Sequence, residues 1–233
     1  MANPEHVKLA SSGPEALDNW RENNPDVELD LEGADLSGVN LAGTKIRAAN
    51  LKGADLSGAR LSRANLAGAD LSGANLNEAD FGQAGMAGVN LTGASVANVN
   101  LFWTDLKGAV LKGAVLTSCR MNRVNLIGAD ISGANFSQSN MIEADLRNSD
   151  MTNALFQSSN MNGADLSRAI MPGADFTLAM IRDSMWIATD VRGASFNQAS
   201  LHRSDFTLAK WDETTTFPEK FDPENTGPKD VND

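Results

Sequence analysis

The sequence contains no tyrosine, one cysteine and two histidines among its 233 residues. The single Cys119 has no partner for an intramolecular disulfide, and two histidines are too few for a histidine-based metal cluster. A lone thiol fits a reducing compartment. We expect His6 in a flexible terminal segment and His202 at an exposed position, so neither is expected to serve a catalytic triad.

Long apolar runs are also missing. No stretch reaches the roughly 18 apolar residues that a membrane span needs, and the opening MANPEHVKLASSG lacks the basic head and apolar run of a targeting signal. There is no P-loop, dinucleotide fingerprint or metal-spaced cysteine pair. The sequence therefore predicts no membrane contact, no cofactor or metal, a cytoplasmic location and no enzymatic activity.

What the sequence does contain is a repeat of five residues. From Leu31 in steps of five to Trp211, all 37 centres are Leu, Ile, Val, Met, Phe or Trp. The residue two before each centre is small almost throughout, as at Ala54 and Ala64. A period of five matches neither a helix nor a strand, so the chain must turn by a fixed angle at each repeat. The pattern predicts a coil with the centres inside.

The ideal repeat, A(D/N)LxG at residues 54–58 and 69–73, resembles the pentapeptide-repeat family. The flanks NWRENNPD and TTTFPEKFDP resemble those of cyanobacterial members. The resemblance implies an all-β fold, a right-handed quadrilateral β-helix with one pentapeptide per side and 20 residues per coil. The repeats then make about nine coils, a rod of roughly 43 Å at about 4.8 Å per coil.

Polar residues beside the centres are expected to shape the turns. Asp or Asn usually precedes a centre, as at Asp35, and such side chains bond local backbone amides. Glycine often stands two after it, as at Gly38, which suits a positive φ. Cys119 occupies a small inward position, where it is expected to act as a core residue.

Three segments are expected along the chain. Residues 14–24 begin with proline and predict a helix, with a shorter helical turn at Val7–Ala10 before it. Phe217 and Phe221 are expected to pack on the last coil, and disorder is expected from about residue 224. The expected segments are a helical cap at 1–28, the β-helix at 29–211 and a tail at 212–233.

Two outward groups are candidates for contact with other molecules. Phe102, Trp103, Arg120 and Arg123 combine exposed aromatic rings with arginine, as interface hot spots do, although a pair that merely shields its ring is the simpler interpretation. Near the carboxyl end, apolar residues stand where polar ones are usual, and their extent predicts a covered surface. The cover is either the chain's own tail or a second copy, so the protein is expected to be a monomer or a carboxyl-terminal homodimer. These residues are Leu178, Met180, Met185, Ile187 and Leu208.

Charge leaves two functions open. Some family members that confer fluoroquinolone resistance are acidic dimeric rods that imitate B-form DNA and bind DNA gyrase. The net charge here is −11, but most of it lies in the two ends, and no basic stripe predicts direct nucleic-acid binding. The leading hypothesis is a non-enzymatic rod that binds a protein partner of unknown identity; the alternative is a DNA mimic directed at gyrase or topoisomerase.

Overall fold

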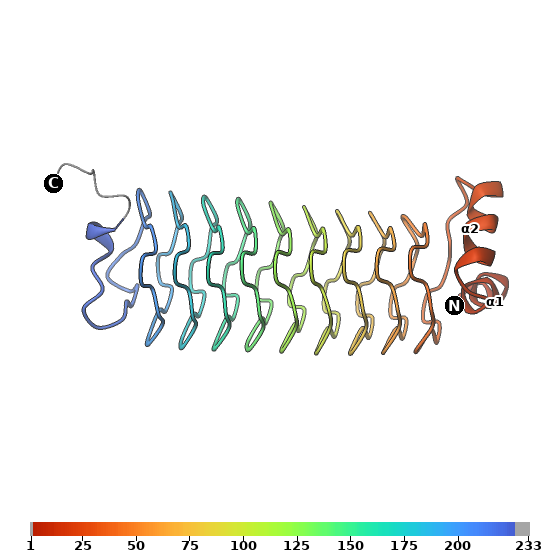
Figure 1. Cartoon of the computed structure of the whole chain (residues 1–233), viewed down its shortest axis with the longest axis horizontal. Coiled ribbons are helices and arrows are strands. Elements are labelled where there is room, and N and C mark those ends of the chain that lie inside the picture. The colour runs from red at the N-terminus through yellow and green to blue at the C-terminus, as the bar shows by residue number, and fades with distance from the viewer. Residues whose placement is uncertain (1, 227–233) are drawn as a thin grey trace.

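A computed structural model of the chain describes residues 2–226. Figure 1 shows a long stack of similar coils with two helices at the amino-terminal end. These helices are α1 (Pro4–Ser11) and α2 (Pro14–Asn23), and a short 3-10 helix, η1 (Pro223–Asn225), lies near the other end.

Each coil takes 20 residues and has four sides. Parallel bridges join residues 20 apart, from Asp30 with Asn50 to Asp190 with Lys210. Sides 1 to 4 are named here by their first pentapeptides, and each side includes every later segment displaced by a multiple of 20. The first pentapeptides are residues 29–33, 34–38, 39–43 and 44–48.

Backbone N–H and C=O groups of each coil form hydrogen bonds with those of the neighbouring coils. The N–H of Leu31 donates to the C=O of Asn50 at 2.7 Å, and the N–H of Asn50 donates back to the C=O of Leu29 at 2.9 Å. This pattern recurs along the stack, so neighbouring coils supply the partners that a single coil lacks.

The interior is apolar, as the period predicts. Every centre from Leu31 to Phe206 is buried, and Trp211 at the end is half-buried. On side 2 the centres form a ladder of parallel phenylalanine rings, with centroids 5.1 Å apart for Phe136 and Phe156 and 4.9 Å apart for Phe156 and Phe176. Buried Trp186 stacks on Phe206 on side 4 and donates from Nε1 to Ser184. The large polar ring is therefore satisfied inside the core.

The amino-terminal segment pairs with the first coil. The N–H groups of Ala2 and Asn3 donate to the C=O groups of Glu32 and Asp30. His6 Nδ1 accepts from the N–H of Asp30 at 3.0 Å. The imidazole ring makes an edge-to-face contact with the Trp20 ring, with ring centroids 5.0 Å apart. The expectation that His6 lies in a flexible terminus is wrong, because α1 holds its ring against the first coil.

The carboxyl-terminal segment continues the stack after a shift of one residue. Thr216 pairs with Ser195, 21 residues away, and Phe217 stacks on Phe196 with centroids 5.3 Å apart. Repeat packing thus continues past Trp211, where the sequence pattern ends. The predicted disorder from residue 224 is wrong for residues 224–226, since η1 forms and Thr226 Oγ1 accepts from the N–H of Phe206 at 2.9 Å. Residues 227–233 lie outside the described part of the chain.

Candidate functional site

The four sides of the rod carry different charges. Side 2 has four carboxylates and no lysine or arginine: Asp35, Asp55, Glu78 and Asp175. Side 3 has six arginines and three carboxylates, so its excess is positive although the whole chain is acidic. The arginines of side 3 are Arg60, Arg63, Arg120, Arg123, Arg182 and Arg203.

The turn of side 3, like that of side 2, carries side chains on most coils. The corner column, defined as residue 43 and every twentieth residue to 203, has positive φ throughout. Side 1 fills the equivalent column with glycine on every coil except at Asn153. The corner column keeps glycine only at Gly43 and Gly163, although a side chain in this conformation costs about 1 kcal/mol. Its remaining members are Arg63, Gln83, Trp103, Arg123, Glu143, Asp183 and Arg203.

Stacking places these side chains in contact. Arg63 Nε donates to Gln83 Oε1 at 3.0 Å, and Arg123 Nε donates to Glu143 Oε2 at 2.7 Å. Near the far end, the Arg203 guanidinium donates to Asp183 and holds the pKa of that carboxyl below its usual value. The corner column is therefore an interrupted ladder of three polar pairs on the outer wall, with Gly163 between the second and third pairs.

An aromatic pair lies midway along this ladder. Trp103 is 54% exposed at φ 56°, and Phe102 stacks beside it with centroids 6.2 Å apart. The guanidinium carbon of Arg123 lies 5.8 Å from the Trp103 ring centroid. The exposed Arg120 stands on the same side, where its backbone pairs with that of Asn100. The structure thus brings three of the four predicted residues together and places Arg120 on the adjoining strand.

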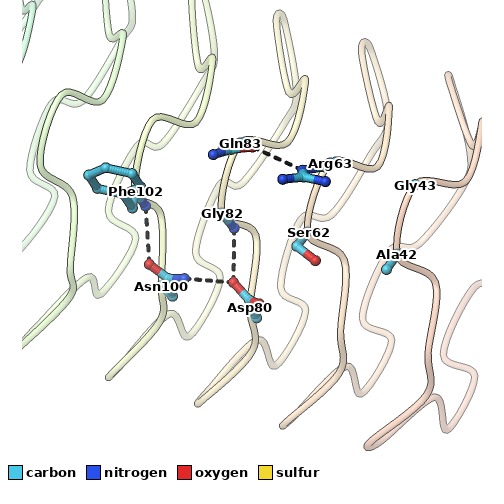
Figure 2. A pocket seen from close by; sticks show the side chains of 9 residues that line it. All are labelled: Ala42, Gly43, Ser62, Arg63, Asp80, Gly82, Gln83, Asn100 and Phe102. Atoms are coloured by element: carbon cyan, nitrogen blue, oxygen red, sulfur yellow. Dashed lines mark hydrogen bonds between the residues drawn. The ribbon is translucent and has the colours of Figure 1, made fainter.

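A shallow trough runs along side 3 toward the aromatic pair. Figure 2 shows the small residues Ala42, Ser62 and Gly82 following one another on successive coils, with Phe102 next in line. The concavity measures about 460 Å³. Sequence reasoning missed it, although small residues spaced by 20 carry its signal.

Hydrogen bonds fix the polar residues of the trough. Asp80 Oδ1 accepts from the N–H of Gly82 at 3.0 Å and from Asn100 Nδ2 at 2.7 Å, as Figure 2 shows. A Cβ at Gly82 would lie only 3.1 Å from Asn100 Nδ2 and 3.2 Å from Asp80 Oδ1. A side chain at this position would therefore require these two groups to shift by a few tenths of an ångström. Within residues 2–226, Arg60 and Arg63 beside it make no ion pair.

The apolar residues near the carboxyl end do not form one patch. Leu178 and Met180 flank the corner between sides 2 and 3, whereas Met185 and half-buried Ile187 lie on side 4. Leu208 is 76% exposed, so the described part of the tail does not cover it. The aromatic rings of that tail pack instead over the end of the core, against Phe196 and Phe206.

Nucleophiles and metal ligands are not assembled in the described part of the chain. Cys119 is buried, and burial raises the pKa of its thiol from 9.0 to about 11. Among residues 2–226, no group of three or more histidine, cysteine, aspartate or glutamate side chains is arranged to hold a metal ion. No helix in the same range is long and apolar enough to cross a membrane.

Comparison with protein families settles the class of the repeat. The family model described as "Pentapeptide repeats" matches eight copies, over residues 27–63, 64–101, 97–133, 119–157 and 159–185. The chain belongs to the pentapeptide-repeat family. Members of this family fold as right-handed quadrilateral β-helices, and the predicted membership is confirmed. No catalytic family is indicated.

Three solved pentapeptide-repeat structures illustrate the similarity. HetL from the cyanobacterium Nostoc sp. strain PCC 7120, involved in heterocyst differentiation regulation, is 23% identical over 86% of this chain and 96% of its own, with a TM-score of 0.49. QnrB1, a plasmid-mediated fluoroquinolone resistance protein, is 18% identical over 75% and 91%, with a TM-score of 0.47. Rfr23 from the cyanobacterium Cyanothece 51142 is 18% identical over 55% and 90%, with a TM-score of 0.26. No curated protein matches the sequence.

Proposed function

We propose that this pentapeptide-repeat protein is a non-enzymatic rod that binds a protein partner through side 3. The recognition surface comprises Phe102, Trp103, Arg120 and Arg123. The observation that carries the proposal is Trp103, a large ring that is 54% exposed at a positive φ, where most coils of side 1 have glycine. A strained and exposed aromatic residue beside arginine has the composition of an interface hot spot.

Charge indicates the chemistry of the partner. Arg60, Arg63 and Arg120 lie near the aromatic pair along side 3, and none makes an ion pair within residues 2–226. An acidic partner surface would meet these guanidinium groups and be guided toward them. Nucleic acid is disfavoured because the chain carries −11 overall and side 3 holds carboxylates among its arginines.

The rest of the chain serves this role in the proposal. Residues 1–28 cap the first coil, residues 29–211 form the rod, and residues 212–233 are the tail, with the protein in the cytoplasm as a monomer. The single free thiol of Cys119 supports a cytoplasmic location, because the cytoplasm keeps thiols reduced. Leu178 lies at the corner after side 2, away from Met185 and Leu208 on side 4. This separation supports a monomer, because a stable interface needs a contiguous apolar core.

A matched pair of variants tests the role of side 3. Trp103→Gly removes the exposed ring, and Leu178→Gly is its control, because Leu178 is 53% exposed at φ 62° on the corner after side 2. Proteins retained from a lysate by the wild type and by L178G, but lost with W103G, are purified and titrated calorimetrically. The expected loss of affinity is at least about 2 kcal/mol for W103G alone. Equal retention by both variants, or turnover of a substrate, would overturn the proposal.

The second candidate is a DNA mimic that binds gyrase or topoisomerase. Side 2 favours it, because Asp35, Asp55, Glu78 and Asp175 stand there without a basic neighbour on that side. Four negative charges along side 2 are few compared with duplex DNA, which carries one negative charge about every 1.7 Å of its axis. A DNA supercoiling assay separates the candidates, since a mimic inhibits gyrase and a variant with all four carboxylates replaced by amides does not. An absence of inhibition by the wild type rejects the mimic.

A further inference from the structure

The last coil leaves backbone groups of side 3 unpaired. One coil earlier, the N–H groups of Ile181 and Asp183 donate to the C=O groups of Ser200 and His202 at 2.9 and 3.0 Å. The equivalent donors on the last coil are the N–H groups of Leu201 and Arg203. Within residues 2–226, neither has an acceptor, and the C=O of Ala199 has no donor. Side 3 therefore ends in an open edge.

The tail bonds in part to each of the other three sides at this end. On side 1, the N–H of Gly193 donates to Thr215 Oγ1 at 3.1 Å. On side 2, the N–H of Phe196 donates to the C=O of Thr216 at 2.7 Å. On side 4, the N–H of Phe206 donates to Thr226 Oγ1. Three threonines thus each accept one N–H group, on sides 1, 2 and 4, although the N–H groups of Gln198 and Leu208 have no acceptor within residues 2–226. On side 3 of the last coil, the described part of the tail accepts from neither Leu201 nor Arg203.

A cavity of about 670 Å³ lies at this open edge. It is lined by Leu201 and Arg203 from the last coil and by Lys220 and Phe221 from the tail. The amino-terminal end contrasts with it, because Ala2, Asn3 and His6 all bond to the first coil. These pairs occupy side 1 of the first coil, so a second copy cannot add a strand there.

We infer that the open edge binds an extended peptide segment of a partner by parallel strand addition. Two N–H groups two residues apart, with a C=O beside them, match an extended backbone, whose carbonyls alternate at this spacing. Leu201 and Phe221 offer apolar contact to a large residue at the centre of the strand. Lys220 and the carboxylates Asp205 and Asp222 all line the cavity, so its charge favours neither an acidic nor a basic residue beside that centre.

The chain itself supplies a probe. In the rod, Asn160 donates its N–H to Ser139 and accepts at its C=O from Met141, while the C=O of Asn162 accepts from Glu143. A synthetic peptide copying residues 158–167, SSNMNGADLS, would repeat these bonds with Ala199, Leu201 and Arg203. A peptide N-methylated at the position of Asn160 cannot donate to Ala199. One methylated at the position of Asn162 loses only the bond of that N–H to the Asn160 side chain. It keeps all three bonds to the edge and is the matched control.

Amide exchange measured by NMR tests the inference. In the free protein, the amides of Leu201 and Arg203 are expected to exchange at least about 100-fold faster than those of Ile181 and Asp183. The peptide and its control should slow both amides by at least about tenfold, and the peptide methylated at the Asn160 position should not. Trp103→Gly is expected to leave this binding unchanged, which separates the open edge from the recognition surface on side 3.

Several results would overturn the inference. Equal protection of Leu201 and Ile181 in the free protein would mean that the edge is closed. Protection that rises with protein concentration would assign the edge to a second copy. If a chain ending at Thr226 binds the peptide at least about tenfold more tightly than the full chain, residues 227–233 are the occupant. Binding of both methylated peptides with equal affinity would exclude strand pairing.

Discussion

The guanidinium carbon of Arg123 lies 5.8 Å from the centroid of the Trp103 ring, one coil away. The same guanidinium donates to Glu143 on the following coil. Arg123 is therefore held from both sides, which reduces its freedom before any partner arrives. A surface ordered in advance loses less side-chain entropy on binding.

The first prediction concerns the stability of W103G. Glycine relieves the strain of a positive φ, worth about 1 kcal/mol, while loss of the exposed cation–π contact removes about 0.5 to 1 kcal/mol. The free energy of unfolding should therefore stay within about 1 kcal/mol of the wild type. Urea denaturation measures it. A loss well above that range would show that Trp103 supports the fold, and partner binding by W103G would then need a different interpretation.

The second prediction concerns the phenylalanine ladder. Phe156 is fully buried between the parallel rings of Phe136 and Phe176. Phe156→Ala should lower the free energy of unfolding by about 3 to 5 kcal/mol because it leaves a cavity, whereas Phe156→Leu should cost less because it leaves a smaller one. Leu76 fills the same column nearer the amino terminus, so the side accepts leucine. Equal effects of the two substitutions in urea denaturation would contradict this account.

The third prediction concerns the junction between α1 and the first coil. His6→Ala removes the acceptor of the Asp30 N–H and the contact with Trp20, so the free energy of unfolding should fall by about 1 to 3 kcal/mol. Lys8→Ala, on the exposed face of α1, is the control and should change it by less than about 0.5 kcal/mol. Hydrogen exchange gives a local readout, because the Asp30 amide should lose protection in the first variant only. Unchanged protection there would show that His6 is dispensable.

The interior of the rod was predictable because its apolar residues recur at every fifth position in the sequence. Each centre follows the last by five residues, and burial from Leu31 to Phe206 requires no knowledge of the partners. The outer wall needs one further quantity, the 20-residue length of the coil. The resemblance to the pentapeptide-repeat family gave this coil length. It places residues 20 apart, such as Trp103 and Arg123, next to each other on neighbouring coils.

The features that escaped prediction depend on contacts between distant segments. The packing of Phe217 on the last coil was expected, but the one-residue shift was not, since it shows only in the pairing of Thr216 with Ser195 and in the stacking of Phe217 on Phe196. A helix as short as α1 is marginal by itself, so the docking of His6 on Asp30 had no local signal. The open edge at Leu201 was equally hidden, because it depends on where the tail fails to pair.

The last prediction concerns Cys119 at alkaline pH. Burial raises the pKa of its thiol from 9.0 to about 11, so the folded state holds its proton after the unfolded state has released it. The contribution to stability is complete below pH 9 and is lost as the pH rises toward 11, by about 1.4 kcal/mol per pH unit. Cys119→Ala introduces alanine, the commonest residue at this position of side 3, and removes the titrating thiol. The stability of the wild type relative to the variant should therefore be constant up to pH 9 and then decline, as urea denaturation over this range would show. A constant difference up to pH 11 would mean that the thiol reaches water in the native rod.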